Sequence, residues 1–168
     1  GDDNIFGDGG NDLLRGGEGI DEIFGGHDAD QLFGGIGGDM LFGENGDDIL
    51  DGGAGPDRLD GGDGSDTASY ETSADGVTID LTLAAQDGGD AEGDTYVDIE
   101  AVRGSGFDDT IKGDRHFNIL EGGDGNDRLV TQDIGANLDA NGFHLHDENN
   151  HQIVVGGIDI LDGGTGFD

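Results

Sequence analysis

The sequence predicts an all-β fold, a parallel β-roll in which the chain winds as a solenoid. Three observations predict it: a nine-residue phrase recurs, an aspartate returns at one place in each phrase, and a large aliphatic residue follows two positions later. The phrase reads G-G-x-G-x-D-x-U-x, where U is the aliphatic residue, and it runs almost unbroken from Gly1 to Ser69. Aliphatic residues at a fixed spacing indicate a folded chain, because a disordered chain does not need them.

The aspartate position of the phrase, called the slot from here on, is filled eight times in succession. The slot residues are Asp3, Asp12, Asp21, Asp30, Asp39, Asp48, Asp57 and Asp66. Position U holds Ile5, Leu14, Ile23, Leu32, Leu41, Leu50, Leu59 and finally Ala68. Because the slot and position U recur every nine residues over eight phrases, each phrase is predicted to form one supersecondary unit.

Each phrase is expected to form a glycine-rich turn followed by a three-residue strand, x-U-x, because glycine readily adopts the positive φ angles of tight turns. Residue U points into the core and its two neighbours point outward. Two phrases complete one coil, so slots eighteen residues apart stack directly, at the ~4.8 Å spacing of neighbouring strands. The slots of alternate phrases therefore line opposite edges of the roll.

The composition is strongly acidic: 40 Asp and Glu residues against 6 Lys and Arg residues give a formal net charge of −34 over 168 residues. A chain so charged repels itself, and it can fold compactly if cations neutralise the slots. The charge argues against nucleic acid and anionic membranes as partners, because their phosphates would be repelled. No apolar run approaches a membrane span, so we expect no membrane insertion. The oligomeric state stays open.

The repeat is interrupted twice, which divides the chain into five expected segments. They are a first repeat block at 1–69, a continuation of the roll with longer strands at 70–103, a second repeat block at 104–130, a non-repeat insertion at 131–155 and the start of a further repeat block at 156–168. Alternating apolar and polar residues at 77–81 and 95–102 predict strands in the continuation. The chain begins and ends within a phrase, so we expect it to be part of a longer protein, because a solenoid needs capping repeats.

The insertion at 131–155 predicts a hairpin, with apolar stretches on either side of a polar run at 147–151. Its histidines His144, His146 and His151 lie close together in the sequence, and residues two apart share one face of a strand. They could bind a transition metal. They could also be incidental residues of a solvated hairpin, which is the interpretation that we favour.

The second repeat block and the C-terminal end supply four more candidate slots, at Asp109, Asn118, Asp127 and Asp168. Calcium prefers roughly six to eight oxygen ligands, which glycine-rich turns can supply as backbone carbonyls and slot aspartates as carboxylates. Asn118 offers an oxygen without a charge, so an ion there should be bound more weakly. Magnesium is a poorer match because it dehydrates reluctantly, and zinc would need His or Cys in the slots, whereas the chain has no Cys.

The repeated phrase resembles that of the RTX (repeats-in-toxin) family of secreted bacterial proteins, whose nonapeptide is a known calcium-binding parallel β-helix repeat. The stretch from Asp66 to Tyr70, followed by 76–81 and 98–100, resembles the longer-stranded segment that commonly follows RTX arrays. The resemblance implies a calcium-stabilised roll with several Ca²⁺ ions, each held between two stacked slots. The implied pairs are Asp3/Asp21, Asp21/Asp39, Asp39/Asp57, Asp12/Asp30, Asp30/Asp48, Asp48/Asp66 and Asp109/Asp127.

The same resemblance implies a function for the chain. It would be a non-enzymatic module of a secreted or cell-surface bacterial protein, exported unfolded by type I secretion machinery and folded by calcium outside the cell. Its partners would be that machinery and the other domains of the parent protein. Two alternatives are an accessory module of an RTX exoenzyme, such as a protease, lipase or polysaccharide epimerase, and the ligand-binding region of an RTX adhesin.

An aromatic row is predicted on the outer face of one sheet, because Phe6, Phe24 and Phe42 follow U in alternate phrases, while Phe33 lies on the opposite sheet. Exposed apolar strips usually mark contact surfaces. We expect another segment of the same protein to cover this row, with 131–155 as a candidate, rather than a separate partner.

Overall fold

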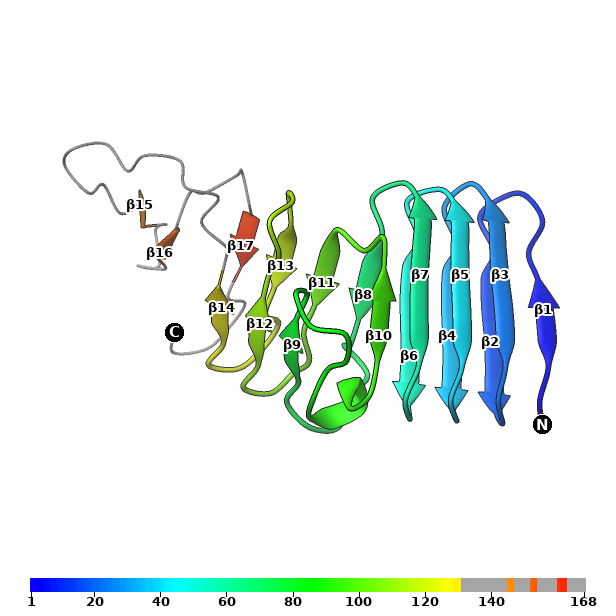
Figure 1. Ribbon diagram of the computed structural model, residues 1–168, viewed down its shortest axis with the longest axis horizontal. Helices are drawn as coiled ribbons and strands as arrows, with labels where there is room; N and C mark the ends of the chain where they lie inside the picture. Colours follow the sequence, from blue (N-terminus) through cyan, green and yellow to red (C-terminus); the bar gives the residue numbers. More distant parts are fainter. Residues whose placement is uncertain (131–144, 147–151, 154–159, 163–168) are drawn as a thin grey trace.

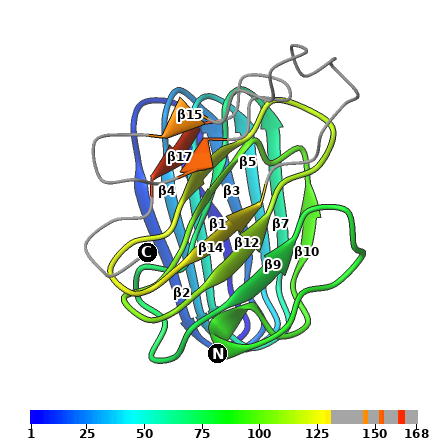
Figure 2. The same cartoon turned by 90° about the vertical axis from the view of Figure 1, so that its left-hand side faces the viewer.

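The computed structural model describes residues 1–130 together with three short strand segments, 145–146, 152–153 and 160–162. The chain winds as a solenoid of parallel strands, and the strands from β1 to β8 lie alternately on two facing sheets (Figure 1). Along the axis of the roll, the coils lie one behind another (Figure 2). The predicted all-β parallel roll is therefore confirmed.

The first sheet has the strand order β1-β3-β5-β7-β10. Its strands are β1 (Asn4–Phe6), β3 (Glu22–His27), β5 (Met40–Asn45), β7 (Arg58–Asp63) and β10 (Thr95–Val97). The second sheet has the order β17-β13-β11-β8-β6-β4-β2. Its strands are β2 (Leu13–Glu18), β4 (Gln31–Ile36), β6 (Ile49–Ala54), β8 (Thr67–Ser69), β11 (Ala101–Arg103), β13 (Ile119–Glu121) and β17 (Ile160–Asp162).

The register confirms stacking at eighteen residues throughout the first block. Ile5 pairs with Ile23 between β1 and β3, and Leu14 pairs with Leu32 between β2 and β4. The aliphatic residues thus form two inward-facing columns whose central members are fully buried. Residues with 0 % exposure in these columns are Ile23, Leu32, Leu41, Leu50, Leu59 and Ala68.

The strands of the first block are longer than the three residues that the phrase predicts. Strands β2 to β7 each have six residues, because the first two residues of the next phrase, a glycine pair in all of them except β5, continue the strand. Gly17 and Gly35 are in register in the ladder of β2 and β4. A Cβ on Gly35 would lie 2.2 Å from the carbonyl oxygen of Gly17, so coils approach this closely only where the side chain is absent.

The segment 70–103 continues the roll, but its predicted longer strands are wrong. Strands β9 (Thr78–Asp80), β10 and β11 have three residues each, and a short 3₁₀ helix, η1 (Gly89–Ala91), lies between β9 and β10. The acidic, glycine-rich stretch before Thr95 folds as a loop, which leaves few residues to extend the strands. The chain then returns to the stack, because Tyr96 pairs with Leu59 and Val102 pairs with Ala68.

The second repeat block adds strands to two sheets. Strand β12 (Thr110–Lys112) lies between β9 and β14 (Arg128–Val130) in a third sheet, while β13 joins β11 to β17. Strands β15 (Leu145–His146) and β16 (Gln152–Ile153) pair antiparallel, in agreement with the predicted hairpin. The rest of the insertion, which includes His144 and His151 of the possible histidine site, lies outside the described residues. Within the described part of the chain, no helix has the length and apolar character of a membrane span.

Candidate metal sites

The slot aspartates form two ladders, one along each edge of the roll where the turns lie. In each ladder the backbone N–H of one slot residue donates a hydrogen bond to Oδ1 of the slot residue in the next coil. The Asp21 N–H donates to Asp39 at 2.8 Å, and the Asp30 N–H donates to Asp48 at 2.7 Å. The same bond joins Asp3 to Asp21 at 2.7 Å. In the first block, each slot carboxylate from Asp21 to Asp66 is therefore fixed by the coil before it.

The second oxygen of these carboxylates, Oδ2, is buried and receives no hydrogen bond. This holds throughout the first block for Asp12, Asp21, Asp30, Asp39, Asp48, Asp57 and Asp66. The last six of these residues are at most 2 % exposed. Burying a carboxylate oxygen without a donor or a cation is costly, so this repeated arrangement suits a positively charged ligand beside each Oδ2.

The space beside each Oδ2 is lined by further oxygen. A Cβ built on Gly34 would lie 2.5 Å from Oδ2 of Asp39 and 2.5 Å from the carbonyl oxygen of Gly52 in the next coil. A Cβ on Gly43 would meet Asp48 Oδ2 at 2.5 Å and the Gly61 carbonyl at 2.6 Å. The first glycine of the phrase thus leaves open a cradle in which a carboxylate and a carbonyl converge. Such a donor set suits a hard cation such as Ca²⁺.

Side chains alone do not complete these cradles. In the part of the chain that the structure describes, no group of three or more His, Cys, Asp or Glu side chains converges as a metal site. An ion in a cradle would therefore depend on backbone carbonyls for much of its coordination. Glycine-rich turns are suited to this, because they expose carbonyl oxygens without side chains in the way.

Burial raises the pKa of several slot carboxyls. The pKa of Asp57 rises from 3.8 to about 8 because burial disfavours its charge; the N–H of Asp39 opposes this, and the nearby carboxylate of Asp94 adds to it. Burial likewise raises the pKa of Asp66 to about 6, with Asp48 contributing repulsion. The pKa values of Asp39 and Asp48 are also raised, again chiefly by burial. A bound divalent cation would oppose both causes.

Two ladder residues were not predicted from the sequence. The N–H of Asp57 donates to Oδ1 of Asp94 at 2.8 Å, and the N–H of Asp66 donates to Oε2 of Glu100 at 3.0 Å. Both acidic residues take the slot position on returning from the segment 70–103, and each precedes an inward residue by two positions, Tyr96 or Val102. That spacing is the signal that could have identified them.

Asp94 also belongs to a buried tyrosine network. The Tyr70 hydroxyl donates to Oδ2 of Asp94 at 2.6 Å, and the hydroxyls of Tyr70 and Tyr96 lie 2.5 Å apart. Asp94 is fully buried and Tyr70 is 1 % exposed. In this coil a phenol therefore satisfies the slot carboxylate, whereas the corresponding oxygens of the first block have no donor.

The slots Asp109 and Asp127 of the second block stack as predicted, but the oxygens of Asp109 have hydrogen-bond donors that the Oδ2 atoms of the first block lack. The Asp109 N–H donates to Oδ1 of Asp127 at 2.9 Å. Both oxygens of Asp109 accept hydrogen bonds, Oδ1 from the N–H of Val77 and from the Ser105 hydroxyl, and Oδ2 from the N–H of Ser105. The candidate slot Asp168 lies outside the described residues.

Asn118 is buried in its slot, with 1 % exposure. Its Oδ1 accepts a hydrogen bond of 2.8 Å from the N–H of Asp114. A Cβ on Gly113 would lie 2.5 Å from this oxygen, so the amide occupies the place that a carboxylate takes in other phrases. The structure therefore stacks Asn118 in register with the coil before it, as Ile119 pairs with Ala101, but the slot oxygens of the two blocks do not all have the same partners.

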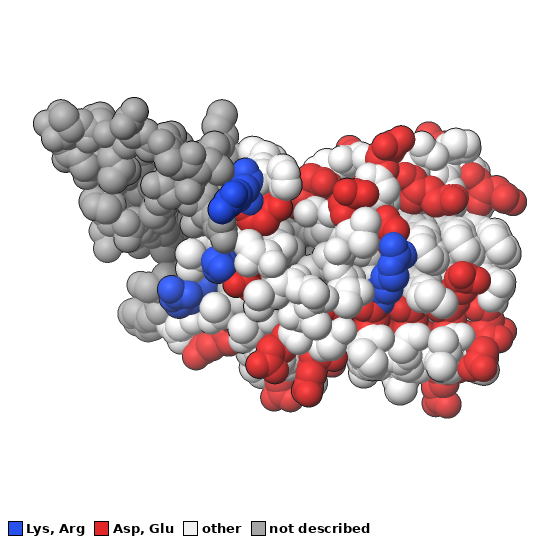
Figure 3. Space-filling model, viewed as in Figure 1, with Lys and Arg blue, Asp and Glu red and all other residues white. Residues whose placement is uncertain are grey.

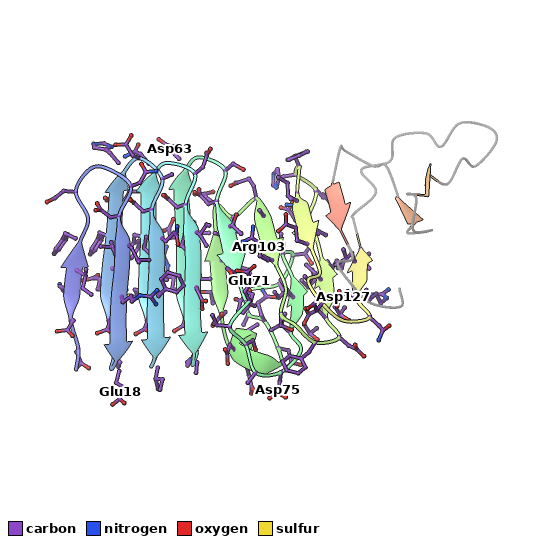
Figure 4. All side chains as sticks on the ribbon, turned by 180° about the vertical axis from the view of Figure 1, so that it is seen from behind. Glu18, Asp63, Glu71, Asp75, Arg103 and Asp127 are labelled. Carbon is purple, nitrogen blue, oxygen red and sulfur yellow. The ribbon has the colours of Figure 1, made fainter. Side chains whose placement is uncertain are left out.

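Acidic side chains gather along the two turn edges of the first block. In the space-filling view, Asp and Glu atoms border the upper and lower margins of this part of the molecule, and Lys and Arg atoms are few (Figure 3). Glu18 and Asp63, at the ends of β2 and β7, lie at opposite edges (Figure 4). Arg103 makes ion pairs with Glu71 at 3.6 Å and with Glu121 at 2.7 Å.

The predicted aromatic row is present on the outer face of the first sheet. The rings of Phe6 and Phe24 stack with centroids 5.0 Å apart, and those of Phe24 and Phe42 stack 4.9 Å apart. The guanidinium of Arg58 lies 5.1 Å from the Phe42 ring centroid and continues the stack. Phe6 is 61 % exposed, while the other two rings are half-buried. The segment 131–155, predicted as their cover, lies almost entirely outside the described residues.

Comparison with known proteins agrees with this geometry. The sequence profile of the RTX calcium-binding nonapeptide repeat matches four stretches, which together make up more than half of the chain. The matched residues are 1–23, 6–41, 42–72 and 103–132. No curated protein matches the chain. The matched stretches contain both repeat blocks, and the profile passes over the loop and short strands between them.

Proposed function

Because the chain belongs to the RTX calcium-binding nonapeptide-repeat family, we propose that this calcium-binding β-roll is a folding-controlled structural module of a larger exoprotein. The observation that carries the proposal is the row of buried slot carboxylates whose Oδ2 atoms receive no hydrogen bond. In a folded chain with a formal net charge of −34, such a row needs cations. Calcium binding then contributes directly to the free energy of folding.

The ions are held between stacked slots of the first block. The proposed pairs are Asp3/Asp21, Asp21/Asp39, Asp39/Asp57, Asp12/Asp30, Asp30/Asp48 and Asp48/Asp66. Calcium supplies the positive charge that lets two neighbouring carboxylates remain ionised while buried. The protein supplies the rest: Oδ2 atoms, glycine carbonyls, and the N–H bonds to Oδ1 that hold each carboxylate in place.

The module works outside the bacterial cell. Where calcium is scarce, the chain is a self-repelling polyanion with one inward aliphatic residue per phrase, and it remains extended enough for export by type I secretion machinery. Where calcium is abundant, the coils stack and the module folds beside the other domains of its parent protein. Its role is structural, and it carries out no catalysis of its own.

A calcium titration tests this proposal. The chain without calcium, kept in a chelator, should show a coil-like circular dichroism spectrum and a large radius in small-angle scattering. Calcium at about millimolar concentration, the weak end of protein calcium sites, should give β signal and compaction. Magnesium at the same concentration is the control and should have little effect. A chelated protein with the spectrum and radius of the calcium form would overturn the proposal.

A further inference from the structure

The backbone angle φ of the second residue of each phrase differs between two kinds of slot. In one kind the slot Oδ2 receives no hydrogen bond, and in the other the second residue donates its N–H to the slot. In all seven complete phrases of the first block this residue has positive φ. These residues are Asp8, Gly17, Gly26, Gly35, Glu44, Gly53 and Gly62, with φ between 69° and 115°. The slots that they precede are the seven whose Oδ2 atoms receive no hydrogen bond.

Two phrases of the second block depart from this rule. Their second residues are Ser105 and Asp114, neither of which is among the residues with positive φ. Each donates its backbone N–H to the slot oxygen four residues later, Ser105 to Asp109 at 2.7 Å and Asp114 to Asn118 at 2.8 Å. The third phrase of the block has Gly123 at this place with φ of 93°, as in the first block.

The physical link is the direction of one peptide group. Rotation about φ turns the peptide that carries the second residue's N–H relative to the four residues that follow, which include the slot. Where φ is positive in the first block, slot Oδ2 receives no N–H, and where φ is not positive, at Ser105 and Asp114, the N–H donates to the slot oxygen. Positive φ costs a non-glycine residue roughly 1–2 kcal/mol, so a side chain at this position favours the arrangement that fills the slot with a hydrogen bond.

From this geometry we propose that Ser105 and Asp114 close the ion sites at Asp109 and Asn118. This inference rests on the proposed function, because it assumes that calcium occupies the slots of the first block. An ion at Asp109 would have to displace the N–H and the hydroxyl of Ser105, and at Asn118 it would meet an amide that already has a donor. Hydrogen bonds thus hold this coil where ions hold the first block.

This difference between slots held by hydrogen bonds and slots held by ions changes how folding depends on calcium. The coil that contains Asp109 and Asn118 does not depend on calcium for its slot contacts, whereas the first block does. The aspartate of the last phrase, Asp127, follows Gly123 and lies outside the proposal. A chain that matches one repeat profile in both blocks therefore contains two kinds of slot, distinguished by the φ angle of the residue that follows the opening glycine.

Paired substitutions at the second residue test the proposal. Ser105→Gly and Asp114→Gly remove the Cβ that disfavours positive φ, and each should raise the number of calcium ions bound per chain, measured by equilibrium dialysis with metal analysis. Ser105→Ala and Asp114→Ala remove the same side-chain groups but keep the Cβ, so neither should change the number. Glu44→Gly removes a carboxylate at a position that already has positive φ, and it also should leave the number unchanged.

The reciprocal substitution is Gly17→Ser, because a Cβ on Gly17 would have no atom within 4 Å and would act through φ alone. It should lower the number of bound ions. The proposal fails if the alanine variants raise the number of bound calcium ions as much as the glycine variants do. It also fails if Ser105→Gly and Asp114→Gly, both folded, and Gly17→Ser all bind the same number of calcium ions as the wild type. Should one glycine variant not fold in calcium, the other decides. A wild-type chain that binds no calcium would instead overturn the proposed function.

Discussion

The backbone N–H of Asp39 donates a 2.7 Å hydrogen bond to Oδ1 of Asp57, eighteen residues later, while Oδ2 of the same carboxylate receives none. One aspartate thus has two tasks, a structural one toward the previous coil and a ligand-like one toward the cradle beside it. This separation explains why the repeat needs a carboxylate. An amide oxygen can also accept a backbone N–H, as Asn118 does from Asp114 within its own phrase, but it carries no charge that would neutralise a cation.

Asp39→Ala should raise the calcium midpoint of folding more than Asp3→Ala. Asp39 accepts the N–H of Asp21 and contributes an oxygen to a cradle inside the stack, whereas Asp3 is exposed in the first coil. Leaving the buried Asp21 N–H without its acceptor costs about 1–3 kcal/mol. Asp39→Asn is the matched control and should lose calcium affinity with a smaller loss of stability. Equal calcium midpoints for the two alanine variants, followed by circular dichroism, would contradict eighteen-residue coupling.

Gly34→Ala should block one cradle. Its Cβ would lie 2.5 Å from both Asp39 Oδ2 and the Gly52 carbonyl, and forcing a methyl group into such a space costs about 1–3 kcal/mol. We expect calcium affinity to fall roughly tenfold or more, by the equivalence of ~1.4 kcal/mol to a factor of ten. Gly9→Ala is the control, because a Cβ there has nothing within 4 Å and φ is not positive. Isothermal titration calorimetry should separate the two, and similar affinities would argue against the cradle.

When an osmolyte keeps the ion-free chain folded, its calcium affinity should increase with pH up to about pH 8. The pKa of Asp57 is raised from 3.8 to about 8 by burial and by neighbouring carboxylates, so the ion-free fold holds more protons than the unfolded chain between these values. The ion-free fold therefore loses stability as pH rises through this window. Calcium needs the ionised carboxylate and must displace that proton, so its affinity changes in the opposite direction.

Two measurements check this pH dependence. Proton release on calcium addition, followed in a weakly buffered solution at about pH 7 that contains an osmolyte to keep the ion-free chain folded, should be positive and should decrease in Asp57→Asn. Well below about pH 4, the ordinary pKa of Asp, all slots should lose their ions. A calcium affinity that does not change between about pH 6 and pH 8 would show that the Asp57 proton and the ion do not compete.

Tyr70→Phe should weaken the junction between the first block and the segment 70–103. The substitution removes the 2.6 Å hydrogen bond to Asp94 and leaves a buried carboxylate oxygen with one donor fewer, at a cost of about 1–3 kcal/mol. The midpoint of urea unfolding in saturating calcium should fall accordingly. The number of ions bound by the first block should be unchanged, since Tyr70 contacts none of its slots except through Asp94. A lower ion count would instead place the tyrosine within the ion sites.

The periodic part of the structure follows from the sequence, because side chains at fixed spacing determine both the register and the buried face. Ile23 and Leu41 pair and are buried as position U requires. Strand length was not predictable in this way, since the glycines that extend each strand have no side chain to show a periodicity. The slot positions of Asp94 and Glu100 were not predictable either, because they depend on how many residues of the segment 70–103 form loops before the chain rejoins the stacked coils. The closed slot at Asp109 depends on one φ angle at Ser105.

Replacing Phe6, Phe24 and Phe42 together with Ser should leave calcium binding nearly intact. The three rings stack on the outer face of the first sheet, away from the cradles in the turns, so their loss removes mutual contacts but no oxygen ligand. Leu41→Ser is the matched control, because Leu41 precedes Phe42, has 0 % exposure and faces the core. It should lower the calcium-bound stability by about 2–5 kcal/mol, as for other large losses of buried apolar volume.

In the intact parent protein, the triple variant should also speed proteolysis of whichever segment covers the row, because that segment loses its apolar contact. Unchanged proteolysis, with the Phe side chains accessible in the intact protein, would show that the row has no intramolecular cover and would favour a surface that binds a separate ligand.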